Sequence, residues 1–529
     1  MKSKTEFIHA NGKGLVDSGD EPIQLKGWGL GNWLVPEGYM WLADQNPRFD
    51  RPRRIEGVVR ELLGTEAAKA FWNKYRENYI TINDLQYIRT CGYNSIRVPV
   101  NWRLFMSDEP QTHFIEAGFE LVDHLLDMAK AAGLYVVIDM HAAPGGQTGA
   151  NIDDGIDDIP RLFIDSDNYE KGLLLWQKIA TRYAENETVA GYDLLNEPLR
   201  PTTVNQRDFD YLVPQLKKFY QDAIKRIRKV DQNHLVVIEG HHWATSTDVV
   251  DFKYDDNKMV EFHRYAVMPD VQAFKNFLTI ADKLNVPLWL GETGENLPIW
   301  NTAITKICDD YNISYHFWPF KKMQETNGLL TYHAPKNWQK IIDYTHGEAR
   351  PEQSEINRIF EELLHNVKFE NCEINKNVDN QTLRKAPYQI RASDFNTMNT
   401  FEKPYEGHQD ANVFGYRKFT GIEIGESRPK QPKQFTFDTD WTRFHVTLHK
   451  DEFVTYTVRN KMDAGHIVIN LTEKMNESDQ IAVYENSEVV KASVKVTQRL
   501  TYPLIAGEGV SVKIQCTGGN LSFDLIEIM

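Results

Sequence analysis

The chain of 529 residues contains only four cysteines, which lie far apart and form neither a CxxC pair nor a zinc-binding spacing. Basic residues are not in excess, because 75 acidic against 60 basic side chains give a net charge of −15. This charge disfavours a nucleic acid or an anionic membrane as partner, since both attract basic surfaces. No apolar run is long enough to cross a bilayer, and the first residues lack the apolar stretch of a signal peptide. We expect a cytoplasmic protein, or a secreted one if a signal was removed.

Hydrophobic residues make up 41% of the chain and charged residues 26%, which is typical of a soluble globular protein. Its length exceeds that of one ordinary hydrophobic core, so we expect two or three domains. Aromatic residues reach 12%, which suits stacking surfaces for sugars but also large cores.

Eight short hydrophobic runs occur before residue 320, most of them followed by a helical pattern. Their continuous apolar character is typical of buried parallel strands. Two of the intervening segments, 117–132 and 207–229, carry apolar residues at the 3.6-residue spacing of amphipathic helices. This alternation predicts a (β/α)8 TIM barrel over residues 1–366, closed by a last helix at about 353–366. The runs are residues 23–29, 93–100, 134–141, 189–197, 235–240, 258–265, 286–293 and 313–320.

The first connection between a strand and its helix is unusually long, at about residues 30–92. It contains a polar, proline-rich stretch before a helix predicted at 66–90, and we expect this excess to fold over the barrel mouth. After Val367 the helical spacing gives way to alternating strands separated by Gly, Asn and Asp turns. This pattern predicts an all-β sandwich over residues 367–529.

The carboxyl ends of the predicted barrel strands carry polar or aromatic residues, which is where such barrels place catalytic groups. Two of these residues are glutamates, Glu197 in VAGYDLLNEP and Glu292 in VPLWLGETG. Two carboxyl groups are the minimum equipment for cleaving a glycosidic bond, one as acid and the other as nucleophile. A cationic side chain near the nucleophile would lower its pKa. The other candidates at these ends are Arg97, His141, Asn196, His263, Tyr265 and Trp318.

The motifs NSIRVPV, DMHAAPGGQ, LLNEP, HRY, LGETG and HFWPF resemble, in this order, the signature of glycoside hydrolase family 5. The resemblance covers residues 20–345 and implies a retaining enzyme that needs no cofactor and no metal. It implies that Glu197 is the acid/base and Glu292 the nucleophile.

The same resemblance assigns the remaining rim residues. Asn196 would bind the sugar 2-hydroxyl, and Arg97 and Tyr265 would hold the nucleophile ionised. The −1 subsite would be lined by two histidines and floored by a tryptophan, namely His141, His263 and Trp318.

Three other polar features near the strand ends are interpreted as structural. Asp139 and Asp193 lie below the rim and are expected to be structural hydrogen-bonding groups. The pair His241–His242 resembles a metal pair, but adjacent residues at a strand end point in opposite directions, so no metal site is expected there.

The segment GLGNWLVPEG, residues 29–38, resembles a segment of exo-β-1,3-glucanases whose glutamate binds the non-reducing sugar. Glu37 matches that glutamate and favours an exo-acting pocket, with a salt bridge to the arginines of 51–54 as the alternative. Asn32 stands where those enzymes have glycine. We expect a carbohydrate substrate, either a β-glucan oligosaccharide or a β-glucoside. An endo-β-glucanase with an open cleft and a non-catalytic sugar-binding barrel are the alternatives, and the oligomeric state stays open.

Residues 388–529 resemble carbohydrate-binding modules of families 6 and 35, on the motifs YQIRASDFN, FVTYTVRN and LSFDLIEIM. The opening glutamate that binds structural calcium in those modules is Ser393 here, while Asp524 matches their closing aspartate. Phe453 replaces their middle tryptophan. A domain that only packs against the barrel is the alternative.

Overall fold

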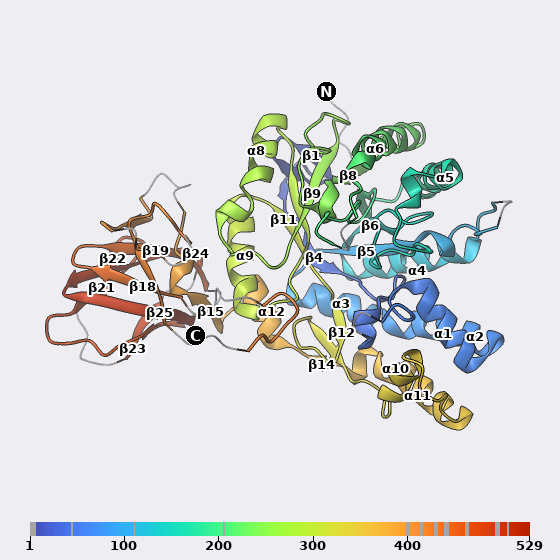
Figure 1. Cartoon of the computed structure of the whole chain (residues 1–529). Coiled ribbons are helices and arrows are strands. Elements are labelled where there is room, and N and C mark those ends of the chain that lie inside the picture. Colours follow the sequence, from blue (N-terminus) through green and yellow to red (C-terminus); the bar gives the residue numbers. More distant parts are fainter. Residues whose placement is uncertain are drawn as a thin grey trace. The chain divides into compact units, whose positions relative to one another are not determined.

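The chain forms two compact units (Figure 1). The first comprises Met1–Arg264, Asn276–Thr293 and Asn312–Ile374, and the second comprises Tyr265–Lys275, Gly294–Tyr311 and Asn375–Met529. The predicted domain boundary at residues 366 and 367 stays a prediction. The computed structural model describes residues 7–43, 46–109, 112–204, 207–397, 403–409, 411–412, 416–427, 432–438, 444–460, 465–491, 498–504 and 507–529.

Unit 1 is built around a closed barrel of eight parallel strands, which confirms the predicted fold class. The strands pair in sequence order, and β11 closes the circle by pairing with β4. They are almost wholly buried, which explains why they read as continuous apolar runs. Their bounds are β4 Lys26–Gly29, β5 Ser95–Asn101, β6 Tyr135–Ala142, β7 Val189–Asp193, β8 Leu235–Glu239, β9 Lys258–Arg264, β10 Leu288–Thr293 and β11 Ser314–Phe317.

The amino-terminal end of the barrel is filled by apolar side chains. Ile8 and Leu15, from the segment of the short strands β1 His9–Asn11, β2 Gly14–Val16 and β3 Pro22–Ile23, join a buried cluster with Val237 and Trp289. This packing leaves the opposite, carboxyl-terminal end for polar groups.

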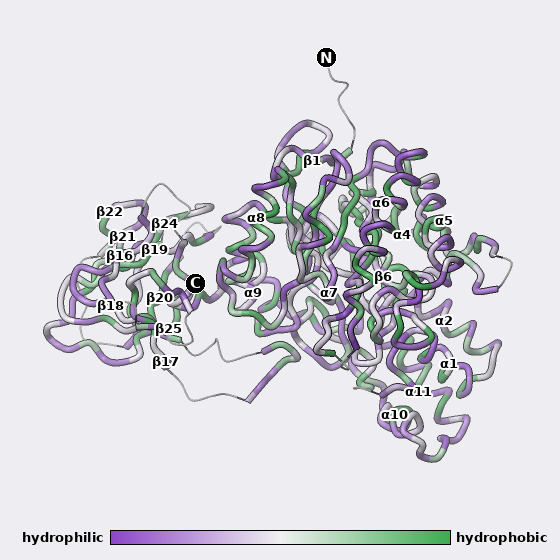
Figure 2. Tube along the Cα trace, turned by 45° about the horizontal axis from the view of Figure 1, so that its top comes forward, coloured by the Kyte–Doolittle hydropathy of each residue, from purple (hydrophilic) through white to green (hydrophobic). Residues whose placement is uncertain are grey.

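Amphipathic helices follow most of the strands, and their alternating hydropathy is visible in Figure 2. The helices expected at 117–132 and 353–366 are α4 Glu116–Ala132 and α11 Gln353–Asn366, and the one expected at 207–229 includes α6 Val213–Ile227. Among the described residues, no helix combines the length and apolar character needed to span a membrane. The further helices of this unit are α5 Ser166–Tyr183, α8 Lys275–Leu284 and α10 Gln339–Thr345.

The connection from β8 to β9 differs from the others, because it contains only the short α7, His241–Ala244. His242, Trp243 and Ala244 have φ values of 57°, 55° and 57°, so this turn is left-handed. Left-handed backbone is costly for side chains other than glycine, and a run of three such residues is unusual.

The long first connection contains three helices, so the single helix predicted at 66–90 is wrong. They are α1 Pro52–Leu63, α2 Thr65–Tyr79 and α3 Ile82–Cys91. Gly64, at φ 84°, separates the first two, and a capping box of Thr81 and Asp84 begins the third. Arg51 pairs with Asp158 at 2.6 Å, so the start of α1 contacts the loop after β6, at the carboxyl end of the barrel.

Unit 2 contains two antiparallel sheets, as the alternating pattern predicted. One sheet has the order β17-β18-β25-β20-β23, with β15 paired to β25, and the other has the order β16-β19-β24-β21-β22. The alternating segment VVKASVKV, residues 489–496, is described only as far as Lys491, and the rest of it lies outside the described residues. The bounds are β15 Tyr388–Arg391, β16 Tyr405–Glu406, β17 Glu423–Glu426, β18 Phe444–His449, β19 Phe453–Asn460, β20 Gly465–Leu471, β21 Gln480–Glu485, β22 Glu488–Lys491, β23 Arg499–Leu504, β24 Gly507–Gly518 and β25 Asn520–Ile528.

Two helices also belong to unit 2, α9 Pro298–Asp310 and α12 Lys376–Leu383, so the expectation that only strands follow Val367 is wrong at α12. Thr302 of α9 donates to the side chain of Gln381 at 2.6 Å, and Asp309 forms ion pairs with Arg384 and with Arg459. Hence α9, which follows β10 in sequence, packs as part of the unit that contains the sheets.

Candidate active site

The candidate acid Glu197 does not lie at the end of a strand. The strand β7 ends at Asp193, and Glu197 follows it in a loop with φ 45°, in the left-handed region. Glu292, by contrast, lies within β10, directly after an irregularity in its pairing with β9. The predicted strand 189–197 is therefore too long by four residues, and a loop rather than a sheet sets the position of Glu197.

The two glutamates face each other beside His263. Nδ1 of His263 lies 2.7 Å from Oε1 of Glu197 and 3.7 Å from Oε2 of Glu292. One oxygen of each carboxylate and one nitrogen of His263 lie within 4.8 Å of one another. Retaining glycosidases have carboxyl groups about 5–5.5 Å apart, whereas inverting enzymes need about 6.5–9.5 Å to admit a water molecule. The geometry matches the retaining arrangement.

The surroundings of the two carboxyl groups differ. Burial raises the pKa of Glu197 to about 7, which favours a carboxyl that carries a proton near neutral pH. Burial lowers the pKa of His263 to about 3, so its imidazole is neutral. Glu292 instead receives a charge-assisted hydrogen bond from Nη1 of Arg97 at 2.5 Å.

Arg97 is fully buried and lies among more carboxylates than its single charge can balance. Burial raises the pKa values of Asp139 and Asp193 to about 7, and it raises those of Glu239 and Glu261 well above their usual value. Part of this set is therefore protonated near neutral pH. The acidic oxygens lie 3.1, 2.7, 3.2, 3.5 and 2.5 Å from the guanidinium, in Asp139, Asp193, Glu239, Glu261 and Glu292 respectively.

Two of these acids, Glu239 and Glu261, were missed by the sequence reasoning. Each lies inside a run of apolar residues, LVVIEG or KMVEFHRY, that identifies a buried strand. Strand alternation could have found them, because a buried charged residue in a barrel strand must point into the lumen near other polar groups.

The structure brings several of the predicted subsite residues together. The ring of His141 stacks on Trp318 with centroids 5.1 Å apart and planes at 6°, and its Nδ1 lies 2.8 Å from Asp139. Oδ1 of Asn196 accepts a hydrogen bond from Nη2 of Arg97 at 2.8 Å. These contacts orient all of these side chains, and Asp139 is a partner of His141 and Arg97.

Two glycines, at the end of β4 and at the start of the first connection, leave the space in which the Trp318 ring lies. A Cβ atom at Gly29 would lie 2.5 Å from this ring, and one at Gly31 would lie 2.7 Å from it. Nε1 of Trp318 donates to the hydroxyl of Tyr39 at 3.0 Å. Glycine is therefore required at both positions of GLGNW, because any side chain there would clash with the Trp318 indole.

Glu37 and Tyr265 are two further candidates. Glu37 precedes the 3-10 helix η1, Gly38–Trp41, and is buried, while the arginines of 51–54 pair with other acids, including Asp50 and Asp154. Tyr265 belongs to unit 2, where its ring packs on Phe437 with centroids 4.7 Å apart. The roles assigned to both residues stay predictions.

The pair His241–His242 does not lie in a strand, so the alternation argument against a metal does not apply to it. The ring centroids lie 4.3 Å apart, and Nε2 of His242 lies 2.6 Å from Asp210. Within the described part of the chain, the acid and histidine groups with metal-compatible spacing include this trio and the set of Glu197, His263 and Glu292. The hydrogen bond between His242 and Asp210 explains why the side chains of the first trio lie close together, so their spacing does not require a metal ion.

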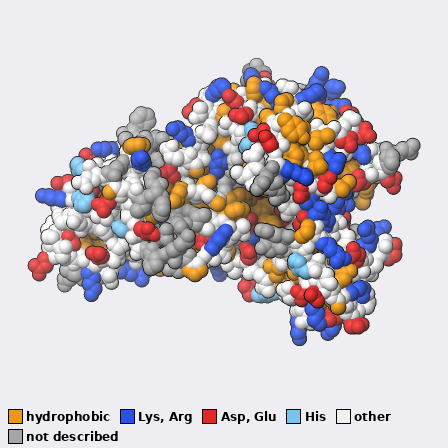
Figure 3. Space-filling model, in the orientation of Figure 1, with side chains coloured by type: hydrophobic (Ala, Val, Ile, Leu, Met, Phe, Trp, Pro, Cys, Tyr) orange, Lys and Arg blue, Asp and Glu red, His pale blue; other side chains and the backbone are white. Residues whose placement is uncertain are grey.

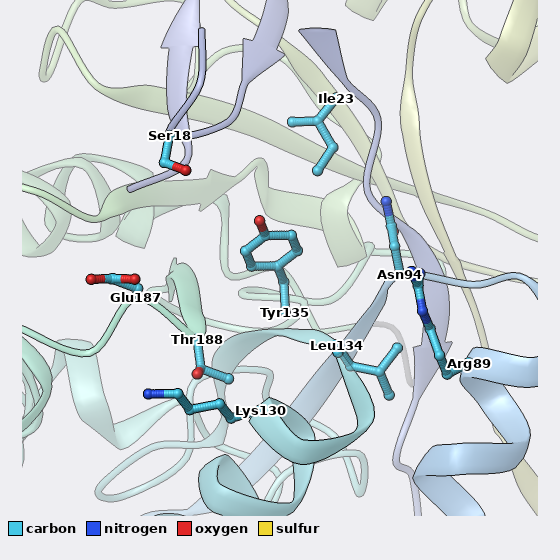
Figure 4. A pocket seen from close by; sticks show the side chains of 10 residues that line it. Ser18, Ile23, Arg89, Asn94, Lys130, Leu134, Tyr135, Glu187 and Thr188 are labelled. Carbon is cyan, nitrogen blue, oxygen red and sulfur yellow. The ribbon is translucent and has the colours of Figure 1, made fainter. Parts of the chain in front are cut away.

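A cavity of about 460 Å³, separate from the candidate active site, lies at the amino-terminal end of the barrel strands. Figure 4 shows Tyr135 near its centre, with Glu187 and Lys130 to one side and Arg89 and Asn94 to the other. None of its lining residues was a candidate, and both charge signs are present. On the face that Figure 3 shows, acidic and basic side chains are likewise interspersed.

A closed eight-stranded barrel with two facing glutamates at its carboxyl-terminal end defines the class of (β/α)8 glycoside hydrolases. The model of the cellulase family (glycosyl hydrolase family 5) matches residues 58–324. The chain belongs to this family, as its motifs predicted.

Named relatives agree with this assignment. A β-xylosidase of Phanerodontia chrysosporium is 28% identical over 263 residues, which are 49% of this chain and 51% of the relative. A probable glucan 1,3-β-glucosidase A of Aspergillus clavatus is 28% identical over 244 residues, 46% of this chain and 55% of the relative. The chain thus spans about half the length of these curated relatives. A solved structure named endogalactoceramidase is similar with a TM-score of 0.49 and 13% identity, over 98% of this chain and 99% of its own.

Proposed function

We propose that the chain is a retaining, exo-acting glycoside hydrolase that removes β-linked glucose from the non-reducing end of β-glucan oligosaccharides or from β-glucosides. The observation that carries the proposal is the approach of the Glu197 and Glu292 oxygens to within 4.8 Å. No water molecule for inversion fits between carboxyl groups at such a spacing.

The geometry supports a double displacement. Glu292 attacks the anomeric carbon while the bond to the leaving oxygen breaks, and Glu197 gives its proton to that oxygen. The product of this step is a covalent glycosyl-enzyme. Because Glu292 is then bonded to the sugar, it no longer carries the negative charge that faced Arg97. Glu197, now ionised, then takes a proton from water, which attacks the same carbon and frees Glu292.

Exo action on glucosides is supported by the buried Glu37 at the start of the first connection and by relatives named glucan 1,3-β-glucosidase. A relative named β-xylosidase supports a second candidate, the release of β-linked xylose. The two sugars differ only in the hydroxymethyl group at C5, so the walls of the −1 subsite must discriminate between them.

The test is a panel of nitrophenyl β-glucoside, nitrophenyl β-xyloside and laminari-oligosaccharides, with the Glu197→Gln and Glu292→Gln variants as controls. Release of glucose alone from the oligosaccharides supports exo action, whereas a ladder of products means an endo-glucanase with a cleft. Turnover of no glycoside by the wild-type chain, or retained turnover by Glu292→Gln, overturns the proposal.

For the sheets of unit 2 we propose a fold of the carbohydrate-binding-module type with a mainly structural role. Phe453, at the position of the tryptophan in the middle motif of those modules, has the ammonium group of Lys513 4.7 Å above its ring. Ser393, at the position of the calcium-binding glutamate, is fully buried. Binding of the Glu292→Gln variant to laminarin, lost on mutation of Phe453, would contradict this role.

A further inference from the structure

Glu239, the last residue of β8, contacts the candidate acid through its backbone. Its Oε2 accepts a hydrogen bond from the backbone N–H of Glu197 at 2.6 Å. Its Oε1 lies 3.2 Å from Nη2 of Arg97 and 3.5 Å from Nε2 of His263. The side chain is fully buried, so these contacts form without competition from water.

The contact matters because it acts on the backbone of Glu197. This residue lies beyond the end of β7 and has the left-handed backbone φ of 45°, which is strained for a residue with a side chain. A buried N–H without an acceptor would destabilise this conformation further. A fixed carboxyl oxygen that accepts from this N–H therefore stabilises the one backbone conformation that aims the Glu197 side chain at His263 and Glu292.

We propose that Glu239 is a positioning residue that holds the acid/base Glu197 in its productive conformation through the backbone N–H. The inference rests on the proposed function, since it needs Glu197 to donate a proton to a leaving group. It assigns a role in catalysis to a strand end that the family motifs of the chain leave without one.

The loss of Glu239 could also reduce activity in a second way, which the experiment has to distinguish from the first. Glu239 also touches Arg97, so its loss could act on the nucleophile Glu292 instead. Asp193 offers the matched comparison, because it is equally buried and contacts the same guanidinium at 2.7 Å. Of these two acids, Glu239 contacts Glu197 directly, because it accepts the hydrogen bond from the Glu197 N–H.

The leaving group of the substrate separates the two routes. A dinitrophenol leaves without protonation, whereas an alcohol needs a proton from the general acid, which contributes about 10²–10⁴-fold. For Glu239→Ala we expect kcat/KM to fall about a hundredfold on an alkyl β-glucoside and less than about tenfold on 2,4-dinitrophenyl β-glucoside. For Asp193→Ala we expect similar losses on both substrates.

Conservative variants keep the test informative if Glu239→Ala fails to fold, which thermal unfolding would show. Glu239→Gln keeps an acceptor oxygen at the same reach and should restore most of the activity on the alkyl glucoside. Glu239→Asp keeps the carboxyl group on a shorter side chain, and should show the leaving-group-dependent loss.

Equal losses on the two substrates in the Glu239 variants would overturn the inference, because Glu239 would then act through Arg97. A Glu239→Gln variant as impaired as Glu239→Asp would overturn it as well. Failure of the proposed function gives a different result, since the wild-type chain would then hydrolyse neither glucoside.

Discussion

Nη1 of Arg97 lies 2.5 Å from Oε1 of Glu292, although the two residues are 195 positions apart in the chain. Arg97 comes from β5 and Glu292 from β10, and β4 and β11 lie between these strands in the barrel. The guanidinium therefore reaches across the lumen. It places one fixed positive charge against the carboxylate that we propose as the nucleophile.

Replacing Arg97 with lysine should reduce kcat/KM about a hundredfold or more on every glycoside, including those with good leaving groups. An ammonium keeps the charge but not the planar fork that reaches Glu292, Asp193 and Asn196 at once. Steady-state kinetics of the purified variant check this. Arg182→Lys, which changes a partly exposed pair with Asp123, serves as the control and should leave activity unchanged. Wild-type kinetics in Arg97→Lys would mean that the fork does not support the nucleophile.

The alkaline limb of the pH profile should report Glu197. Burial raises its pKa to about 7, so the carboxyl is protonated and able to donate below that pH. As the pH rises through about 7 the proton is lost, and kcat/KM for an alkyl glucoside should fall tenfold per pH unit. Such a profile is measured on the free enzyme at low substrate concentration. A dinitrophenyl glucoside needs no proton and should lack this limb. An identical limb with both substrates would assign it to another group.

Gly29→Ala should displace Trp318, because the new methyl group would lie 2.5 Å from the indole. Since the ring also stacks on His141, we expect a higher KM and a loss of about 1–3 kcal/mol in the free energy of unfolding. Kinetics and chemical denaturation measure the two effects. Gly57→Ala is the matched control, since nothing lies within 4 Å of its Cβ and it stands inside α1. That change should stabilise the protein slightly. Equal behaviour of the two variants would mean that Gly29 is not required by Trp318.

Much of the fold could be predicted because its signals are local. The apolar runs locate all eight barrel strands, and the bounds of α11 agree with those expected at 353–366. The break between α2 and α3 was overlooked because apolar spacing continues through Ile80. Thr81 and Asp84, three residues apart, do carry the capping signal in the sequence.

The site could be predicted only where a residue follows a recognisable motif. The facing of Glu197 and Glu292 was expected, but the loop position of Glu197 was not, since LLNE reads as a continuation of the strand. The role of Glu239 could not be predicted for another reason. It depends on a contact with the backbone of Glu197, which lies in the loop after the neighbouring strand β7. No spacing within LVVIEG encodes that contact. The left-handed turn at His242 was not predicted either. β8 ends at Glu239, whereas the apolar run suggests a strand that continues to Gly240.

The ion pairs of Asp309 test whether unit 2 depends on α9. Asp309 bonds Arg384, which is 4% exposed, and Arg459 at 2.7 Å, so Asp309→Ala removes a carboxylate that lies against a buried guanidinium. Breaking a buried pair in this way costs about 3–5 kcal/mol, so the thermal unfolding of the full chain should begin several degrees lower. Asp282→Ala removes an exposed pair with Lys13 and should change stability by less than about 0.5 kcal/mol. If the two variants unfold at the same temperature, α9 is not held by these arginines. If only Asp309→Ala is destabilised, the residues around the sheets of unit 2 support α9, the helix that follows β10 in sequence.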